Sequence, residues 1–259
     1  MNRIEQKLAM LKEKKEKALV TYLTAGLPDM DGTKKLMFAM EEAGADVIEL
    51  GIPFSDPVAD GQVIQDASYR SICLGTGINA VFQMMEEIRS QELKIPVVFK
   101  LYYNTILHYG MKNFAEKCKE TGVDGLILPD LPIEEQEQLR NTLEEMEASI
   151  LIQFVSSVSV ERIPAVLKHA RGFVLCIPSA ETSACLQKVK EISDIPVMME
   201  FGDLCAGEMK PLKAEVDGII TESHFVQYLE EHNYNIDAAK EYCRHFKQTM
   251  IGQNAETLS

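Results

Sequence analysis

VIEL, at residues 47–50, is a short apolar run that holds one carboxylate, and the loop GIPFSDPVADG follows it at residues 51–61. Short apolar runs with β-branched residues, bounded by Gly and Pro, predict strands that are buried on both faces. The run therefore predicts a central strand of a parallel sheet. The loop after it places further carboxylates at the strand's carboxyl end.

Runs of this kind recur along the chain and alternate with segments of helical period. The eight predicted strands are Ala18 to Leu23, Val47 to Leu50, Pro96 to Leu101, Gly125 to Leu128, Ser149 to Phe154, Gly172 to Ile177, Pro196 to Met199 and Gly218 to Ile220. Helices are predicted between them, for example over Lys34 to Glu42, Val81 to Arg89, Phe114 to Glu120, Glu134 to Glu147 and Val160 to Ala170. Eight strand–helix units in 259 residues predict a single (β/α)₈ TIM barrel of the α/β class, with a doubly wound open sheet as the alternative.

The two ends of the chain add to this barrel. Ile4, Leu8 and Leu11 recur at helical spacing, which predicts an extra N-terminal helix that closes the bottom of the barrel. Ile236 to Phe246 is predicted as the last helix. No linker or change of composition divides the chain, so we predict one domain over residues 1–250 and a disordered tail over 251–259.

Charge and composition narrow the functional classes. The 26 Lys and Arg residues against 40 Asp and Glu residues give a net charge of −14, which disfavours nucleic acid and anionic membranes as partners. The six cysteines form no C-x-x-C pair, so neither a metal site nor a disulfide framework is indicated. Charges run through the first twenty residues, unlike a signal peptide, and a cytoplasmic protein is expected.

Catalytic groups of such barrels lie at the carboxyl ends of the strands. Glu49 occupies this position, and burial there would raise its pKa toward neutrality, as a proton-transfer group requires. The alternative is a carboxylate that is solvated or paired with a lysine. Asp60 would complete an acid/base pair, or it would be the N-cap of the helical segment that begins near Val63. The residues alone leave both alternatives open.

One further motif is discounted on its context. Residues 75–80 read GTGINA and match the dinucleotide fingerprint G-x-G-x-x-A. That fingerprint must follow a strand, whereas Gln65 to Leu74 has helical character. We therefore predict a turn between two helices at this place.

Several stretches together resemble the tryptophan synthase alpha chain family. ELGIPFSDPVADG (residues 49–61) is long and specific, and YLTAGLP (22–28), Y-x-N (102–104) and GVDGLILPDLP (122–132) agree with the family in order. The resemblance implies a TIM barrel that cleaves indole-3-glycerol phosphate to indole and glyceraldehyde 3-phosphate by retro-aldol chemistry. It implies a carbon–carbon lyase of tryptophan biosynthesis with no cofactor, beside a pyridoxal-phosphate beta subunit.

The same resemblance implies roles for particular residues. Glu49 matches the proton-transfer residue, and Asp60 matches the carboxylate that accepts a hydrogen bond from the indole N–H. The implied substrate-binding residues are Tyr22, Tyr102, Phe201, Gly202 and Ser223, and the implied contacts with the beta subunit are Pro53, Asp56, Asp130 and Pro132.

The second half of the chain departs from the family where the substrate phosphate would bind. Glu200 and Glu222 stand in place of glycines, and the loop after the sixth strand is shorter. Glycines at such sites let backbone N–H groups approach an anion, whereas inward glutamates would repel it. The alternatives are two glutamates that turn outward, or an alpha-like paralogue that regulates a beta subunit or acts on a non-phosphorylated substrate.

Overall fold

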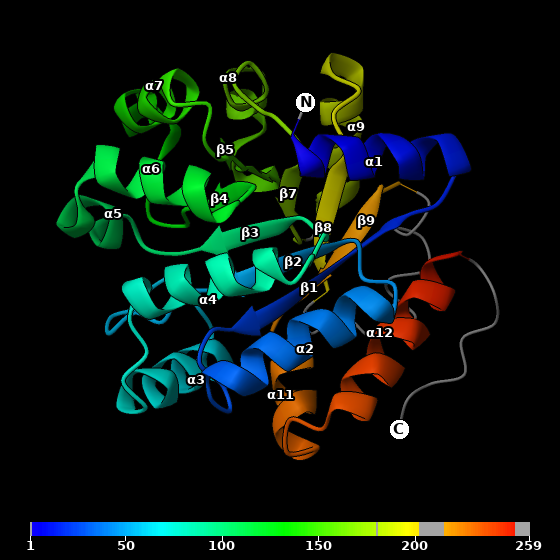
Figure 1. The fold of residues 1–259 in the computed structure, drawn as a ribbon. Helices are drawn as coiled ribbons and strands as arrows, with labels where there is room; N and C mark the ends of the chain where they lie inside the picture. Colours follow the sequence, from blue (N-terminus) through cyan, green and yellow to red (C-terminus); the bar gives the residue numbers. More distant parts are fainter. Residues whose placement is uncertain (1, 180, 202–214, 252–259) are drawn as a thin grey trace.

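The computed structural model describes residues 2–179, 181–201 and 215–251 of the chain (Figure 1). Its strands are β1 (Ala18–Thr24), β2 (Val47–Gly51), β3 (Val97–Lys100), β4 (Gly125–Ile127), β5 (Ile150–Leu151), β6 (Gln153–Ser156), β7 (Val174–Ile177), β8 (Val197–Phe201) and β9 (Gly218–Thr221). They form a sheet in the order β5-β4-β3-β2-β1-β9-β8-β7-β6, and every pair of neighbours is parallel.

The two ends of this sheet are consecutive pieces of the chain. β5 pairs with β4, β6 pairs with β7, and Ile152 alone separates β5 from β6. The fifth predicted strand is therefore split in two, and the sheet closes through it into a barrel. The (β/α)₈ prediction is confirmed, and the open doubly wound sheet is wrong.

Helices surround the strands (Figure 1). They are α1 (Arg3–Lys14), α2 (Met30–Glu42), α3 (Gln62–Cys73), α4 (Ile78–Ser90), α5 (Tyr103–Tyr109), α6 (Met111–Thr121), α7 (Glu137–Glu145), α8 (Ile163–Leu167), α9 (Thr182–Ile192), α11 (Ser223–Glu231) and α12 (Ile236–Ile251), with 3₁₀ turns η1 (Ile133–Glu135) and η2 (Ser157–Arg162). Two predicted helices are shorter than expected. α8 begins only at Ile163 because Pro164 favours the first turn of a helix, and α7 begins after the separate turn η1.

The inside of the barrel follows the two-residue alternation of its strands. Val47, Val98, Met198 and Ile220 point inward and form one apolar cluster. The apolar side chains of α1, namely Ile4, Leu8 and Leu11, join this cluster and are buried, which confirms that α1 closes the bottom of the barrel. Each such buried side chain contributes about 1.5 to 3 kcal/mol to stability.

The motif at residues 75–80 and the prediction for the tail can also be compared with the structure. Gly75 has φ +84° after α3, and Gly77 is the N-cap of α4, so GTGINA is a turn between two helices as predicted. Residues 252–259 of the predicted tail lie outside the described residues. Among the residues described, no helix has the length and apolar character needed to cross a membrane.

Candidate active site

A polar layer lies directly above the apolar cluster, at the carboxyl ends of the strands. The sequence alternation dictates it, because Glu49 and Lys100 lie two residues after the inward-facing Val47 and Val98. The strand register places Tyr22 opposite Glu49 and Lys100 opposite Gly51. These positions bring titratable side chains from three adjacent strands into the mouth of the barrel.

Glu49 is completely buried at the end of β2. Neither of its oxygens has a hydrogen-bond donor among the described groups, and a bond to the neighbouring Glu222 carboxylate requires a proton on one of the two. Burial raises the pKa of Glu49 well above its usual value, the charges of Glu222 and Glu200 raise it further, and Lys100 lowers it. Glu49 therefore keeps its proton to higher pH than an ordinary glutamate does, and it is not a solvated carboxylate.

Asp60 belongs to the loop after β2 and points into the same mouth. Its Oδ2 accepts a hydrogen bond from the Tyr102 hydroxyl over 2.8 Å, and its Oδ1 lies 3.0 Å from the Lys100 ammonium. The N-cap of α3 is Gly61, and no side chain caps that helix end. The capping alternative for Asp60 is therefore wrong, and its role in an acid/base pair with Glu49 stays a prediction.

Tyr102 fixes the position of Asp60. Its hydroxyl accepts a hydrogen bond from the backbone N–H of Ala59 over 3.0 Å, and its ring stacks on Phe54 at a centroid distance of 5.0 Å. Burial raises the pKa of the Tyr102 phenol, and the hydrogen bond to Asp60 raises it further, so the hydroxyl keeps its proton. The loop of residues 54–60 is thereby held against the end of β3.

Lys100, the last residue of β3, is a site residue that the sequence reasoning missed. Its ammonium lies 2.6 Å from Glu222 Oε2 and 3.0 Å from Asp60 Oδ1, and 5.5 Å from the ring centroid of Tyr22. Burial lowers the pKa of this ammonium, but the charges of Glu222, Glu49 and Asp60 oppose that effect and raise the pKa well above its usual value. The sequence signal that could have identified Lys100 is its position two residues after Val98, which faces the inside of the barrel.

Glu222 and Glu200 both line the mouth of the barrel. Glu222 follows β9, is 4% exposed and reaches Lys100 across the mouth, so the alternative in which it turns outward is wrong. Glu200, on β8, is half-buried and lines the same cavity as Glu222. The two residues therefore line one cavity, and their effect on a substrate phosphate stays a prediction.

That cavity has a volume of about 480 Å³ and opens at the carboxyl ends of the strands. Its lining includes Lys100, Glu222, Glu200, Leu175 and Phe154. Glu49 is not among the lining residues, because its side chain is completely buried.

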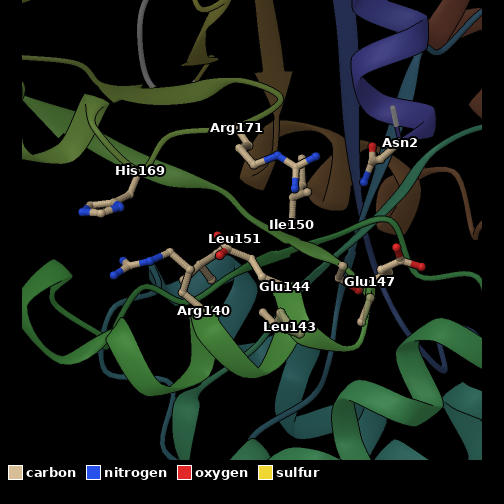
Figure 2. Close-up of a pocket in the computed structure, with 11 residues that line it drawn as sticks. Asn2, Arg140, Leu143, Glu144, Glu147, Ile150, Leu151, His169 and Arg171 are labelled. Atoms are coloured by element: carbon tan, nitrogen blue, oxygen red, sulfur yellow. The ribbon is translucent and has the colours of Figure 1, made fainter.

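A second cavity lies at the opposite end of the barrel (Figure 2). Its volume is about 500 Å³, and Arg140, Glu144, His169 and Arg171 line it near the beginning of β5. Arg171 is already paired with Glu5 over 3.0 Å. Because active sites of such barrels lie at the carboxyl ends of the strands, this cavity is not the reaction site.

The other predicted site residues are spread over the mouth and its rim. Tyr22 is buried on β1, and Ser223 is half-buried at the start of α11. Phe201 ends β8 and its side chain is not described, while Gly202 lies outside the described residues. Pro53 is half-buried, whereas Asp56, Asp130 and Pro132 are exposed on the loops after β2 and β4.

The rim loop after β4 contacts the residue next to Tyr102. Both carboxylate oxygens of Asp130 accept a hydrogen bond from the Tyr103 N–H at 3.0 Å.

No group of three or more His, Cys, Asp or Glu side chains within the described part of the chain is arranged to hold a metal ion. The chemistry available from the described side chains is proton transfer by buried carboxyl groups.

Comparison with known proteins agrees with this geometry. The family model for the tryptophan synthase alpha chain matches residues 8–254. The tryptophan synthase alpha chain of Lachnospira eligens is 51% identical, covering 96% of this chain and 99% of the relative, and that of Alkaliphilus metalliredigens is 40% identical, covering 89% and 90%.

Solved structures give the same result. The crystal structure of tryptophan synthase subunit alpha from Legionella pneumophila superposes with a TM-score of 0.89 at 32% identity, covering 97% of this chain and 99% of that one. A chain in the aminoacrylate-bound form of tryptophan synthase from M. tuberculosis superposes with a TM-score of 0.86 at 29% identity, covering 95% and 98%.

Proposed function

Because this chain belongs to the tryptophan synthase alpha chain family, we propose that it cleaves indole-3-glycerol phosphate to indole and glyceraldehyde 3-phosphate. The family makes it a lyase of tryptophan biosynthesis, and the specific reaction is our proposal. The observation that carries it is the pairing of two unlike carboxyl groups in the mouth. Glu49 is buried with a raised pKa, and Asp60 is bound to Tyr102 and Lys100.

The two groups fit different parts of a retro-aldol cleavage. Protonated Glu49 delivers its proton to C3 of the indole ring, and Asp60 accepts a hydrogen bond from the indole N–H. Positive charge develops on the ring as C3 becomes tetrahedral, and the Asp60 carboxylate stabilises it. The bond between C3 and the glycerol side chain then breaks, and its electron pair returns to the ring.

The remaining proton comes from the substrate. The glycerol hydroxyl next to the breaking bond loses its proton to the Glu49 carboxylate and becomes the aldehyde oxygen of glyceraldehyde 3-phosphate. Glu49 ends the cycle protonated, so no external base or cofactor is consumed. We place Tyr22 and Tyr102 beside the indole part of the substrate, and Phe201, Gly202 and Ser223 at the end that carries the phosphate.

The test is indole release from indole-3-glycerol phosphate by the purified protein, measured with and without a tryptophan synthase beta subunit. We expect indole in both cases, and a strongly reduced rate for Asp60→Asn because the amide cannot balance charge on the ring. A wild-type protein that releases no indole even with the beta subunit contradicts the proposed reaction.

We also propose that a beta subunit docks on the rim formed by Pro53, Asp56, Asp130 and Pro132. Three of these residues are exposed, and Asp130 connects the rim to the site through the Tyr103 N–H. Native mass spectrometry with a cognate beta subunit should show a complex at micromolar concentration. Asp56→Lys should weaken that complex, whereas Glu144→Lys, at the opposite end of the barrel, should not.

One observation favours a second candidate function. The Glu222 carboxylate lies inside the mouth, where the resemblance implies a phosphate site. The alternative substrate is therefore an indole-glycerol compound without the phosphate, on which the same Glu49 and Asp60 chemistry would act. A higher kcat/KM for unphosphorylated indole-3-glycerol than for the phosphate ester would establish this candidate.

A further inference from the structure

We propose that Lys100 is a positioning residue: its ammonium binds Glu222 and Asp60 together and thereby confines the proton of the buried cluster to Glu49. The inference rests on the proposed function only in taking Glu49 as the proton-transfer group. The sequence motifs assign no role to Lys100, and the resemblance implies a glycine where Glu222 stands. The pair is therefore a feature of this chain's own residues.

Lys100 forms ion pairs with two carboxylates, whereas Glu49 forms none with any described side chain. Lys100 Nζ lies 2.6 Å from Glu222 Oε2 and 3.0 Å from Asp60 Oδ1, and all three side chains are at most 12% exposed. Such buried charges are stable only when they are paired. Glu49 has no hydrogen-bond donor and no ion pair among the described side chains, and its neighbour is the Glu222 carboxylate, so it is the carboxyl group that holds the proton.

The groups that face Glu49 come from every neighbouring strand end. They are Tyr22 on β1, Lys100 on β3, Glu200 on β8 and Glu222 after β9, and Asp60 reaches the same cluster from the loop after β2. Tyr22 is a neutral phenol, because burial raises its pKa above the ordinary value. Among the described side chains, Lys100 is therefore the cation that balances Glu222 and Asp60.

Removing the two members of the pair should have opposite effects on Glu49. Without the Lys100 ammonium, the carboxyl groups of Glu49 and Glu222 share one proton, which is lost only at higher pH. Without the Glu222 carboxylate, Lys100 remains and Glu49 loses its proton at lower pH. A role in packing alone would not shift the same ionisation in opposite directions.

The experiment is a pH titration of the protein labelled with ¹³C at the glutamate carboxyl carbons, followed by NMR. Glu49→Gln and Glu222→Gln assign the two resonances by their loss. In the wild type we expect the Glu49 resonance to titrate above the ordinary glutamate range. In Lys100→Met the Glu49 resonance should titrate about one pH unit or more higher, because the ammonium that lowers its pKa is gone.

Two further variants complete the test. Glu222→Gln should move the Glu49 titration down by about one pH unit or more, since it removes a neighbouring negative charge. Lys117→Met, which removes an exposed lysine paired with Glu120 on α6, should leave the Glu49 titration unchanged. Where activity is present, the pH profile of kcat/KM should follow the same shifts.

The outcomes separate this inference from the proposed function. The titration uses no substrate, so opposite shifts support the role of Lys100 even when no indole is released. Shifts of the same sign in Lys100→Met and Glu222→Gln overturn it. If Lys100→Met does not fold, Glu222→Gln alone decides, and an unchanged Glu49 titration in that variant overturns the inference.

Discussion

The Tyr102 hydroxyl donates a hydrogen bond to Asp60 Oδ2 over 2.8 Å and accepts one from the Ala59 N–H over 3.0 Å. One side chain at the end of β3 therefore orients both the carboxylate and the backbone of the loop after β2. These two hydrogen bonds hold Asp60, a loop residue, in a fixed position in the mouth of the barrel. It also makes Tyr102 a sensitive place for substitution.

Tyr102→Phe keeps the ring that stacks on Phe54 but removes both hydrogen bonds. A hydrogen bond to a charged group contributes about 1.5 to 3 kcal/mol, so kcat/KM for indole release should fall about 10- to 100-fold. Steady-state kinetics measure this change. Tyr69→Phe, on the exposed side of α3, is the control and should behave as wild type. Equal rates for both variants would mean that Asp60 is oriented by other contacts.

Glu49→Gln should stabilise the protein increasingly as pH rises. The folded state raises the pKa of Glu49, so it keeps a proton that the unfolded chain releases above the ordinary glutamate range. Wild-type stability therefore declines between the ordinary and the raised pKa, and glutamine does not titrate. Urea unfolding at a series of pH values should show the variant's advantage growing through that window. A constant difference would show that Glu49 titrates normally.

Gly51→Ala should damage the site through Tyr22. A Cβ at Gly51 would lie 1.9 Å from Tyr22 Oη and 2.4 Å from Cζ, so the tyrosine ring would have to leave its place over β2. Overpacking of this kind costs about 1 to 3 kcal/mol. Thermal unfolding should register the loss, together with a fall in activity. Gly77→Ala, whose Cβ would meet no atom within 4 Å, should have a smaller effect on stability and none on activity.

Glu222→Gly should strengthen binding of glyceraldehyde 3-phosphate, because it removes an inward carboxylate and leaves the Lys100 ammonium available to the anion. Calorimetric titration should show tighter binding by about 10- to 1,000-fold. The added Glu200→Gly change should improve binding further.

The double variant Glu222→Gly, Lys100→Met is the matched control for this prediction, and it should recover only part of the gain. Tight wild-type binding that Glu222→Gly does not change would mean that the phosphate binds away from both glutamates.

The barrel and the position of Glu49 at its mouth follow from local features of the sequence. Apolar runs such as VIEL at 47–50 are strands because β-branched residues favour extended, doubly buried backbone, and Glu49 sits at the carboxyl end of that run. The split of the fifth strand at Ile152 is not visible in the apolar run from Ser149 to Phe154, because it depends on pairing with β4 and β7.

The surroundings of Glu49 and Asp60 depend on contacts between distant parts of the chain. Lys100 and Glu222 are 122 residues apart, and nothing local to either of them indicates the 2.6 Å contact. The residues next to Asp60 also do not show whether it caps α3 or faces the mouth. It faces the mouth because it contacts Tyr102 and Lys100 there. Strand parity alone predicts the side to which Lys100 points, two residues after Val98, but it does not predict its partners.

If the buried Glu49 carries the proton in indole release, its replacement by glutamine must slow the reaction strongly. The rate of indole release from indole-3-glycerol phosphate is compared between wild type, Glu49→Gln and Glu144→Gln, whose carboxylate lies at the opposite end of the barrel. We predict a loss of about 10² to 10⁴ for Glu49→Gln and an unchanged rate for Glu144→Gln. A Glu49→Gln variant that keeps most of the wild-type rate contradicts the account.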